Sequence, residues 1–292
     1  MQKKAYFFIL MAASLWGCLG VFLKLLTAAG LTSMQSVAVR TGVATVLYFV
    51  FLWATDRKAL KIKLRDCHYF VGTGILSVVF FNWCYFNTIQ LSSLSVAAVL
   101  LYTSPVFVML LSALLFHEPI TRRKVLALCL TFLGCSLVTG MLPLGSQGIS
   151  TKTILFGLGA GFGYALYTIF SKFALEKYSS GTVSFYTFLF ATLAALPLSG
   201  LVGELPILLD WRAIVGGLCI GVFCCILPYF FYTEGLCHAE AGKAAILATA
   251  EPFVASLLGI LLFQEMLTPF KLLGMAAILG AIVLLNSKSA RT

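Results

Sequence analysis

Charged residues are scarce in this sequence. Asp, Glu, Lys and Arg make up 10% of its 292 residues, and hydrophobic residues make up 61%. Soluble globular chains carry roughly 25% charged residues, and so few polar groups cannot cover a folded surface that faces water. The composition therefore excludes an ordinary soluble protein and predicts an integral membrane protein whose surface faces lipid.

Sequence patterns of metal, nucleotide and nucleic-acid sites are missing as well. The nine cysteines include no CxxC pair, and the three histidines, His68, His117 and His238, lie far apart, so no metal ion or other cofactor is expected. Residues 157–163 are rich in glycine but lack the Lys and the Ser or Thr of a phosphate-binding loop. The basic residues behind the net charge of +10 are not interleaved with aromatics, so nucleic acid is not an expected partner.

Ten apolar runs, each of the roughly 20 residues that cross a bilayer as a helix, follow one another with short gaps. They cover about residues 5–27, 33–53, 69–89, 94–116, 124–142, 153–174, 182–203, 211–233, 243–263 and 269–286. The first run is too long for the apolar core of a signal peptide, so we expect it to be retained as a helix.

Lys and Arg are divided unequally between the two sides of these runs. When the N-terminus is placed inside, the outer segments hold only Lys152, Arg212 and Lys271. The inner segments hold Lys3, Lys4, Arg57, Lys58, Lys61, Lys63, Arg65, Arg122, Arg123, Lys124, Lys172, Lys177, Lys243, Lys288 and Arg291. Because cytoplasmic loops carry the excess of basic residues, we expect a multi-pass protein of the cell (inner) membrane with both termini in the cytoplasm.

The chain also repeats itself. AAVLLYTSPVFVMLLSALLFHEPITRRK (97–124) aligns with AAILATAEPFVASLLGILLFQEMLTPFK (244–271) at an offset of 147 residues. The identical pairs include Pro105/Pro252, Glu118/Glu265, Thr121/Thr268, Lys124/Lys271 and, further back, Tyr85/Tyr232; an offset of 148 pairs Trp16 with Tyr164 and Lys24 with Lys172.

Each copy holds five runs, an odd number, so the second copy enters the membrane from the opposite side. The predicted fold is all-α and integral to the membrane, with ten transmembrane helices arranged as two inverted-topology five-helix repeats. We place the first repeat at 1–142, a linker at 143–152 and the second repeat at 153–292. Many secondary transporters are built in this way, with the substrate site near the membrane midplane between the repeats.

Three stretches resemble a known family. They are SLWGCLGVFLK (14–24), LLFHEPITRRKVLALCLTFLGCSLV (114–138) and its echo LLFQEMLTPFKLLGMAAILGAIVL (261–284). They are similar to EamA-type members of the drug/metabolite transporter superfamily, and the resemblance covers the whole chain, once per half. It implies a transporter of a small molecule, because family members export amino acids and other metabolites or import small molecules. Pro119 and Met266 depart from the basic or small residue that is commoner after the shared Glu.

Glu251 is a carboxylate placed deep in the ninth run, immediately before Pro252. An ionisable residue at membrane depth costs roughly 3 kcal/mol on insertion scales and is a functional candidate by default. Its helical stripe, Ala244, Ala248, Glu251, Ala255 and Gly259, carries small residues, which predicts that Glu251 faces the bundle. Packing against another helix is the structural alternative.

Two prolines are expected to interrupt their helices. Pro252 cannot donate to the carbonyl of Ala248, and Pro105 leaves the carbonyl of Leu101 free at the equivalent place in the first repeat. The sequence therefore predicts two related helix breaks that face one cavity.

Arg40 lies some seven residues into the second run, on a stripe with Ser33 and Ser36. It either extends its charge to the membrane surface or has a functional role, in which it binds a carboxylate or holds Glu251 ionised. With these two charges, the candidate substrate-binding residues are Trp16, Asn82, Tyr85, Tyr102, Tyr164 and Tyr232. Aromatic faces of this kind stabilise a desolvated cation by about 1–2 kcal/mol.

Four further charges lie near helix ends. Lys24 and Lys172 are expected to reach the membrane surface. Glu118 and Glu265 are expected to cap the helix that follows each of them, with gating as the alternative.

Three kinds of function are compatible with these features. The favoured one is a secondary transporter that moves a small polar metabolite, an amino-acid-like compound or an amine, by alternating access, with export expected. It would be driven by a gradient or by exchange, with Glu251 as a possible site for a coupling proton. A non-transporting assembly or sensor subunit stays open. An integral membrane transferase is disfavoured because no His/Asp/Ser or His/Glu constellation is present, so no enzymatic activity is expected; the oligomeric state is left open.

Overall fold

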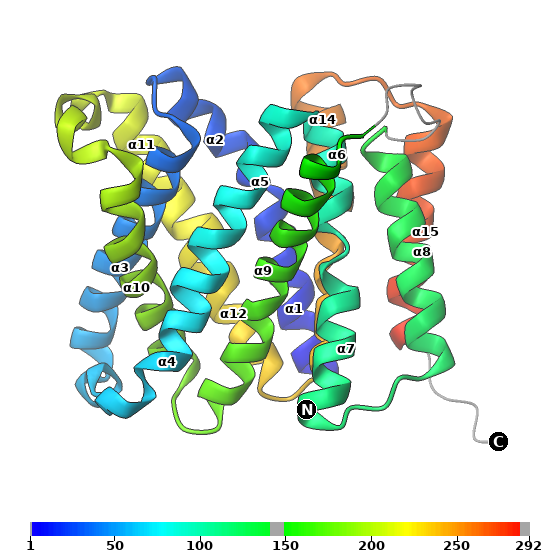
Figure 1. Ribbon diagram of the computed structural model, residues 1–292, viewed down its shortest axis with the longest axis horizontal. Helices are drawn as coiled ribbons and strands as arrows, with labels where there is room; N and C mark the ends of the chain where they lie inside the picture. The colour runs from blue at the N-terminus through cyan, green and yellow to red at the C-terminus, as the bar shows by residue number, and fades with distance from the viewer. Residues whose placement is uncertain (1, 141–148, 287–292) are drawn as a thin grey trace.

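The computed structural model describes residues 2–140 and 149–286, which form a bundle of helices that run roughly side by side between two faces (Figure 1). The helices of the first half are α1 (Gln2–Gly17), α2 (Leu19–Ala28), α3 (Ser33–Thr55), α4 (Cys67–Phe70), the π-helical η3 (Val71–Val79), α5 (Phe80–Leu91), α6 (Leu94–Leu101), α7 (Ser104–Phe116) and α8 (Arg122–Val138). Two short 3₁₀ turns, η1 (Arg57–Leu60) and η2 (Leu64–Asp66), connect α3 to α4.

The second half follows a similar order, except that its first crossing is one continuous helix, α9, where the first half has α1 and α2. Its helices are α9 (Thr151–Leu175), α10 (Ser180–Ser199), α11 (Trp211–Cys219), the π-helical η5 (Ile220–Ile226), α12 (Leu227–Leu236), α13 (Ala241–Ala248), α14 (Ala250–Phe263) and α15 (Pro269–Asn286). A 3₁₀ segment, η4 (Leu201–Leu209), follows α10, so the membrane helix predicted over 182–203 ends earlier, at Ser199.

These elements join end to end into the predicted ten crossings. Nine of the crossings in the described residues are at least 18 residues long and apolar enough to span a membrane. The other is α8, which has 17 residues and packs along α15. The all-α membrane fold is thus confirmed, while the predicted end of the fifth span, residues 141–142, lies outside the described residues.

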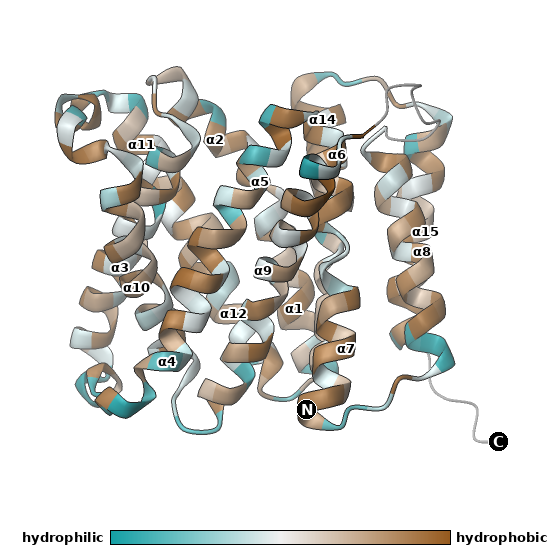
Figure 2. Cartoon of the chain, viewed as in Figure 1, coloured by the Kyte–Doolittle hydropathy of each residue, from teal (hydrophilic) through white to brown (hydrophobic). Residues whose placement is uncertain are grey.

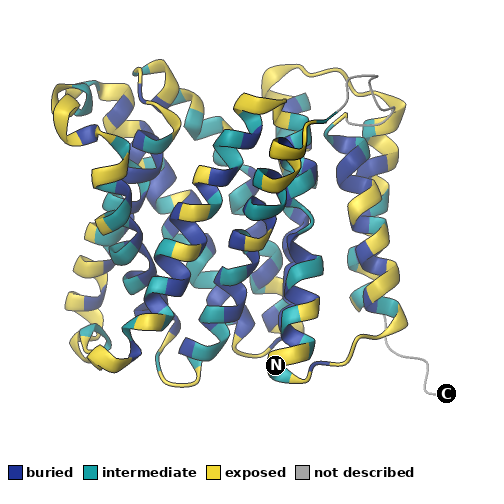
Figure 3. Cartoon of the chain, viewed as in Figure 1, coloured by how far each residue is buried: buried dark blue, intermediate teal, exposed yellow. Residues whose placement is uncertain are grey.

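The outer surface of the bundle is apolar, and hydrophilic residues gather at its two faces (Figure 2). Large side chains such as Leu114, Leu193, Leu261 and Val283 are exposed along the sides, while the interior between the helices is buried (Figure 3). An exposed apolar belt of this size suits lipid rather than water.

The two halves are inverted copies. α1 starts at the face where both termini lie, and α9 starts at the opposite face (Figure 1). The repeat extends to backbone detail, because α7 and α14 both end in a left-handed residue, His117 and Gln264, each with φ 54°. The next residues, Glu118 and Glu265, each donate their N–H to a carbonyl in the last helical turn, at 3.2 and 3.1 Å.

Both predicted helix breaks are present. α6 ends at Leu101 and α7 begins at Ser104, while α13 ends at Ala248 and α14 begins at Ala250. Each proline lies in the first turn of the second helix, where a missing N–H costs no hydrogen bond. The prediction that one helical stripe runs from Ala244 to Gly259 was wrong, because Thr249 interrupts the helix and Ala255 is exposed.

Glycine permits a close backbone contact between α8 and α15. A Cβ added at Gly274 would lie 2.7 Å from the carbonyl oxygen of Gly134, whereas one added at Gly280, on the same helix, would meet nothing within 4 Å.

Gly274→Ala should therefore destabilise the protein by about 1–3 kcal/mol, because the added methyl group forces the two backbones apart. Gly280→Ala is the matched control and should be neutral or raise stability by about 0.5–1 kcal/mol, the usual helical gain over glycine. Thermal unfolding in detergent measures both. Equal melting temperatures for the two variants would show that the α8–α15 contact is looser than described.

Candidate substrate cavity

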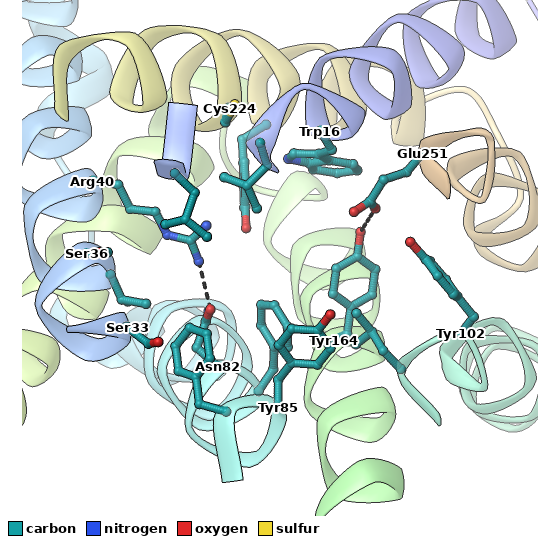
Figure 4. A pocket seen from close by; sticks show the side chains of 17 residues that line it. Trp16, Ser33, Ser36, Arg40, Asn82, Tyr85, Tyr102, Tyr164, Cys224 and Glu251 are labelled. Carbon is teal, nitrogen blue, oxygen red and sulfur yellow. Dashed lines mark hydrogen bonds between the residues drawn. The ribbon is translucent and has the colours of Figure 1, made fainter. Parts of the chain in front are cut away.

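A cavity of about 140 Å³ lies between helices of both repeats (Figure 4). The side chains around it come from α1, α2, α3, α5, α6, α9, η5, α12 and α14 and from the break between α6 and α7. Its lining includes Trp16, Ser33, Ser36, Arg40, Phe81, Asn82, Tyr85, Tyr102, Tyr164, Cys224, Tyr229 and Glu251. The cavity is smaller than the roughly 300–1,000 Å³ of drug-sized sites, so its dimensions suit a small metabolite.

Arg40 supplies positive charge at one side of the cavity. It lies on α3, whose start is fixed by a capping box in which the side chain of Thr32 accepts from the N–H of Gln35 and the side chain of Gln35 accepts from the N–H of Thr32. Nη2 of Arg40 donates to Oδ1 of Asn82 at 2.9 Å, and Asn82 donates its own amide to the carbonyl of Val78 at 2.6 Å. The guanidinium is thereby aimed into the cavity and does not reach the surface.

Glu251 supplies negative charge at the opposite side (Figure 4). It lies in the first turn of α14, where the helix dipole favours a carboxylate. The hydroxyl of Tyr164 donates to Oε2 of Glu251 at 3.4 Å, which is long for an O–H···O bond. The carboxylate therefore keeps most of its capacity to accept hydrogen bonds from a ligand.

These two charges do not neutralise each other. The Arg40 guanidinium and the Glu251 carboxylate are farther apart than the 4.0 Å of an ion pair. Breaking a buried ion pair leaves an uncompensated charge, which is costly. An arrangement with opposite charges on two sides of one cavity is therefore suited to a ligand that carries both.

Aromatic rings close the cavity toward the face that carries the termini. The ring of Trp16 lies 5.4 Å from that of Tyr229 and 5.3 Å from that of Tyr232, and Tyr167 lies 4.9 Å from Tyr229. Tyr232 does not line the main cavity; it lines a small adjoining one and hydrogen-bonds Thr168 at 2.7 Å.

Toward the opposite face the cavity opens. A wider vestibule of about 610 Å³ shares Trp16, Tyr85, Tyr102 and Glu251 with it. The vestibule continues past Pro252 and ends among the residues Gln90, Leu94, Ser95, Thr139, Glu265 and Lys271. Glu251 is thus reached from the face opposite the termini, while Pro105 is buried away from both spaces.

Ion pairs join the two repeats at the face that carries the termini. Glu118 accepts hydrogen bonds from Nζ of Lys172 at 2.6 Å and from the backbone N–H groups of Ala241 and Gly242 at 2.7 and 3.1 Å. Lys124 lies against Glu240 in the same cluster. Glu118 therefore joins the first repeat to the start of α13 in the second.

Two expectations for the charges at the helix ends need correction. Lys172 does not reach for the membrane surface, because it pairs with the buried Glu118. Glu118 does not cap the helix after it, because Thr121 does so, and Glu118 caps α13 instead. Lys24 places its ammonium 3.1 Å from the centroid of the Phe263 ring.

The cavity contains every sequence-predicted binding residue except Tyr232, and it adds some that the sequence reasoning missed. Tyr229, Phe81 and Cys224 are the main additions. Tyr229 had a usable signal, because it stands 147 residues after Asn82 and so occupies the equivalent place in the second repeat. Phe81 and Cys224 are ordinary apolar helix residues with no such signal.

Comparison with known proteins gives a family. The EamA-like transporter family matches the chain twice, over residues 3–140 and 151–287. The chain belongs to this family. An uncharacterized transporter of Archaeoglobus fulgidus is 31% identical over 245 residues, which cover 82% of this EamA-family chain and 83% of the relative.

Two other comparisons extend this result. The threonine/homoserine exporter RhtA of Escherichia coli K12 is 28% identical over 249 residues, 84% of this EamA-family chain and 78% of that protein. A solved crystal structure superposes with a TM-score of 0.79 at 17% identity, covering 97% of this chain and 96% of the other. At that identity the superposition supports the fold alone.

The ion cluster at the face of the termini predicts a pH dependence of stability. Burial disfavours the charge of Glu118, but the hydrogen bonds from Lys172, Ala241 and Gly242 outweigh burial and hold the pKa of Glu118 below its ordinary value of 4.5. A lowered pKa gives stability that is present above the ordinary value and lost as pH falls through the folded-state pKa.

Glu118→Gln should therefore lower the melting temperature in detergent at neutral pH, and the difference from wild type should shrink as pH falls below 4.5. Thermal unfolding of both proteins across this pH range measures the difference. A gap that stays constant down to the lowest pH would mean that the charge of Glu118 contributes nothing.

Proposed function

We propose that this protein is a secondary transporter that moves a small zwitterionic metabolite, an amino acid or a close relative, across the cell membrane by alternating access. The observation that supports it most directly is the placement of Arg40 and Glu251 on opposite sides of one small cavity. A simple amine is the second candidate, because Glu251 and the aromatic rings would bind it without help from Arg40.

Each part of a zwitterion has a partner in the cavity. The substrate carboxylate binds the guanidinium of Arg40, whose planar donors suit a carboxylate. The substrate ammonium binds Glu251 and lies near the rings of Trp16 and Tyr164, which adds a cation–π contribution. The whole cavity measures about 140 Å³, which leaves room for only a short substrate side chain beside these two groups.

One of the two relatives supports this substrate class and its direction. The Escherichia coli relative is named threonine/homoserine exporter, and this name describes the outward movement of small hydroxylated amino acids. Transfer of that activity to this chain at 28% identity is part of the proposal. That this protein has no enzymatic activity and lies in the cell membrane is also part of the proposal.

Orientation and energy source complete the proposal. The excess of Lys and Arg in the loops on the side of the termini supports a cytoplasmic position for both termini, and with that orientation the vestibule opens to the outside. Energy comes from a proton gradient or from exchange. Glu251 takes either a proton or the substrate ammonium, so release of one is tied to binding of the other.

Exchange of labelled threonine by the purified protein in liposomes tests the function. Glu251→Gln and Arg40→Gln should each slow the exchange at least about tenfold, since each removes a charged hydrogen-bond partner. Glu176→Gln, at an exposed position outside the cavity, is the matched control and should exchange as wild type does. Binding of amino acids without any flux would instead favour the sensor or assembly subunit.

Proton coupling gives a separate prediction. An imposed pH gradient should accelerate flux through wild type and the residual flux through Arg40→Gln, because both keep the Glu251 carboxylate. It should not accelerate the residual flux through Glu251→Gln. Equal acceleration of all three would remove Glu251 from the coupling role.

A further inference from the structure

We propose that Glu118 and Glu265 are paired latches that close the two faces of the protein in turn. In the structure Glu118 closes the face of the termini. In the opposite conformation Glu265 leaves Lys271, binds Lys24 and the first backbone N–H groups of α6 at Leu94 and Ser95, and closes the vestibule. This inference rests on the proposed alternating access and assigns residues to its two end states.

The two glutamates occupy equivalent places. They stand 147 residues apart in the aligned repeats, and each follows a left-handed residue with φ 54°. Each also donates its N–H back to the end of its own helix, at 3.2 and 3.1 Å. Their backbones therefore present the two carboxylates in the same way, one at each face of the inverted structure.

All the strong partners of Glu118 come from the other repeat. They are Lys172, Ala241 and Gly242. The repeat offsets of 148 and 147 convert these positions to Lys24, Leu94 and Ser95 in the first repeat. The partners that Glu265 would need are therefore present, including a lysine at the matching position.

The cation–aromatic contacts of the two lysines match as well. Lys172 lies over the ring of Phe116 at 5.4 Å, and Lys24 lies over the ring of Phe263 at 3.1 Å. Phe116 and Phe263 are themselves equivalent at the offset of 147. Lys24 is thus already docked beside the helix end that carries Glu265.

The two glutamates differ in state. The Glu118 side chain is 7% exposed and bound across the repeats, whereas the Glu265 side chain is 51% exposed and paired at 2.8 Å with Lys271 of its own repeat. Lys124, the equivalent of Lys271, lies 3.9 Å from Glu118 and forms its closer ion pair with Glu240. Each glutamate thus has a lysine of its own repeat for the open state and one of the other repeat for the closed state.

The vestibule shows where the second latch would close. Leu94 and Ser95, at the start of α6, line it together with Glu265 and Lys271. The first N–H groups of a helix have no partner within the helix, and a carboxylate is well suited to bind them. Closure of this space would give α6 the cap that Glu118 now gives α13.

Carbodiimide treatment of the purified protein in liposomes, without added substrate, tests the inference. The reagent joins a lysine to a carboxylate only when the two are in contact, and peptide mass spectrometry identifies the products. Wild type should give Lys172–Glu118 and Lys271–Glu265 products. It should also give a Lys24–Glu265 product, which requires a change of conformation because the ammonium of Lys24 lies over the Phe263 ring and forms no ion pair with Glu265 in this structure.

Glu118→Gln removes the latch at the face of the termini and should shift the population toward the opposite state. The ratio of Lys24–Glu265 to Lys271–Glu265 products should therefore rise several-fold, and Glu176→Gln should leave it unchanged. Lys172→Gln breaks the same ion pair from its other partner and should give the same rise, which guards against misfolding of one variant.

Absence of the Lys24–Glu265 product from wild type and both latch variants overturns the inference, and so does a ratio that neither variant changes. Since no substrate is added, the result is independent of the substrate class. A shifted ratio in a protein that transports no amino acid would keep the latches and reject the proposed substrate.

Discussion

A charge held at the depth of a lipid bilayer costs about 2.5–3.5 kcal/mol on insertion scales, and this cost governs the centre of the molecule. For Arg40 this cost is offset by the hydrogen bond to Asn82 and by the cavity into which it points. For Glu251 it is offset by the hydrogen bond from Tyr164 and by the dipole at the start of α14. The two side chains lie on opposite sides of the same cavity (Figure 4). A ligand of complementary polarity gains from both charges without having to break an ion pair between them.

The helix breaks make this arrangement possible. The backbone can leave the helical path at membrane depth only where the freed groups lie inside protein or line a cavity, and both breaks lie between the repeats. In the described residues, each half has a helix break at a proline, a π-helical segment and one helix that ends in a left-handed residue other than glycine. The halves nevertheless differ, because Glu118 is bound across the repeats while Glu265 lines the wide vestibule.

Much of this was predictable from sequence for a physical reason: a charge or a proline in an apolar run is conspicuous. Glu251, Arg40 and both helix breaks were found in that way. Lys172 was misjudged because its partner, Glu118, lies in the other repeat, and only the tertiary fold brings them together. Tyr232 lies outside the main cavity, although its equivalent Tyr85 lines it, since a symmetric sequence cannot tell which half is closed.

The most direct measurement is the thermal stability of wild type with three matched ligands: threonine, its methyl ester and the hydroxy acid that lacks the amine. A ligand that binds the folded state raises the melting temperature by mass action. Charges on two sides of one cavity predict a clear rise with threonine and smaller rises with the ester, which lacks the negative charge, and with the acid, which lacks the positive one. Equal rises with threonine and either analogue would contradict recognition by both Arg40 and Glu251.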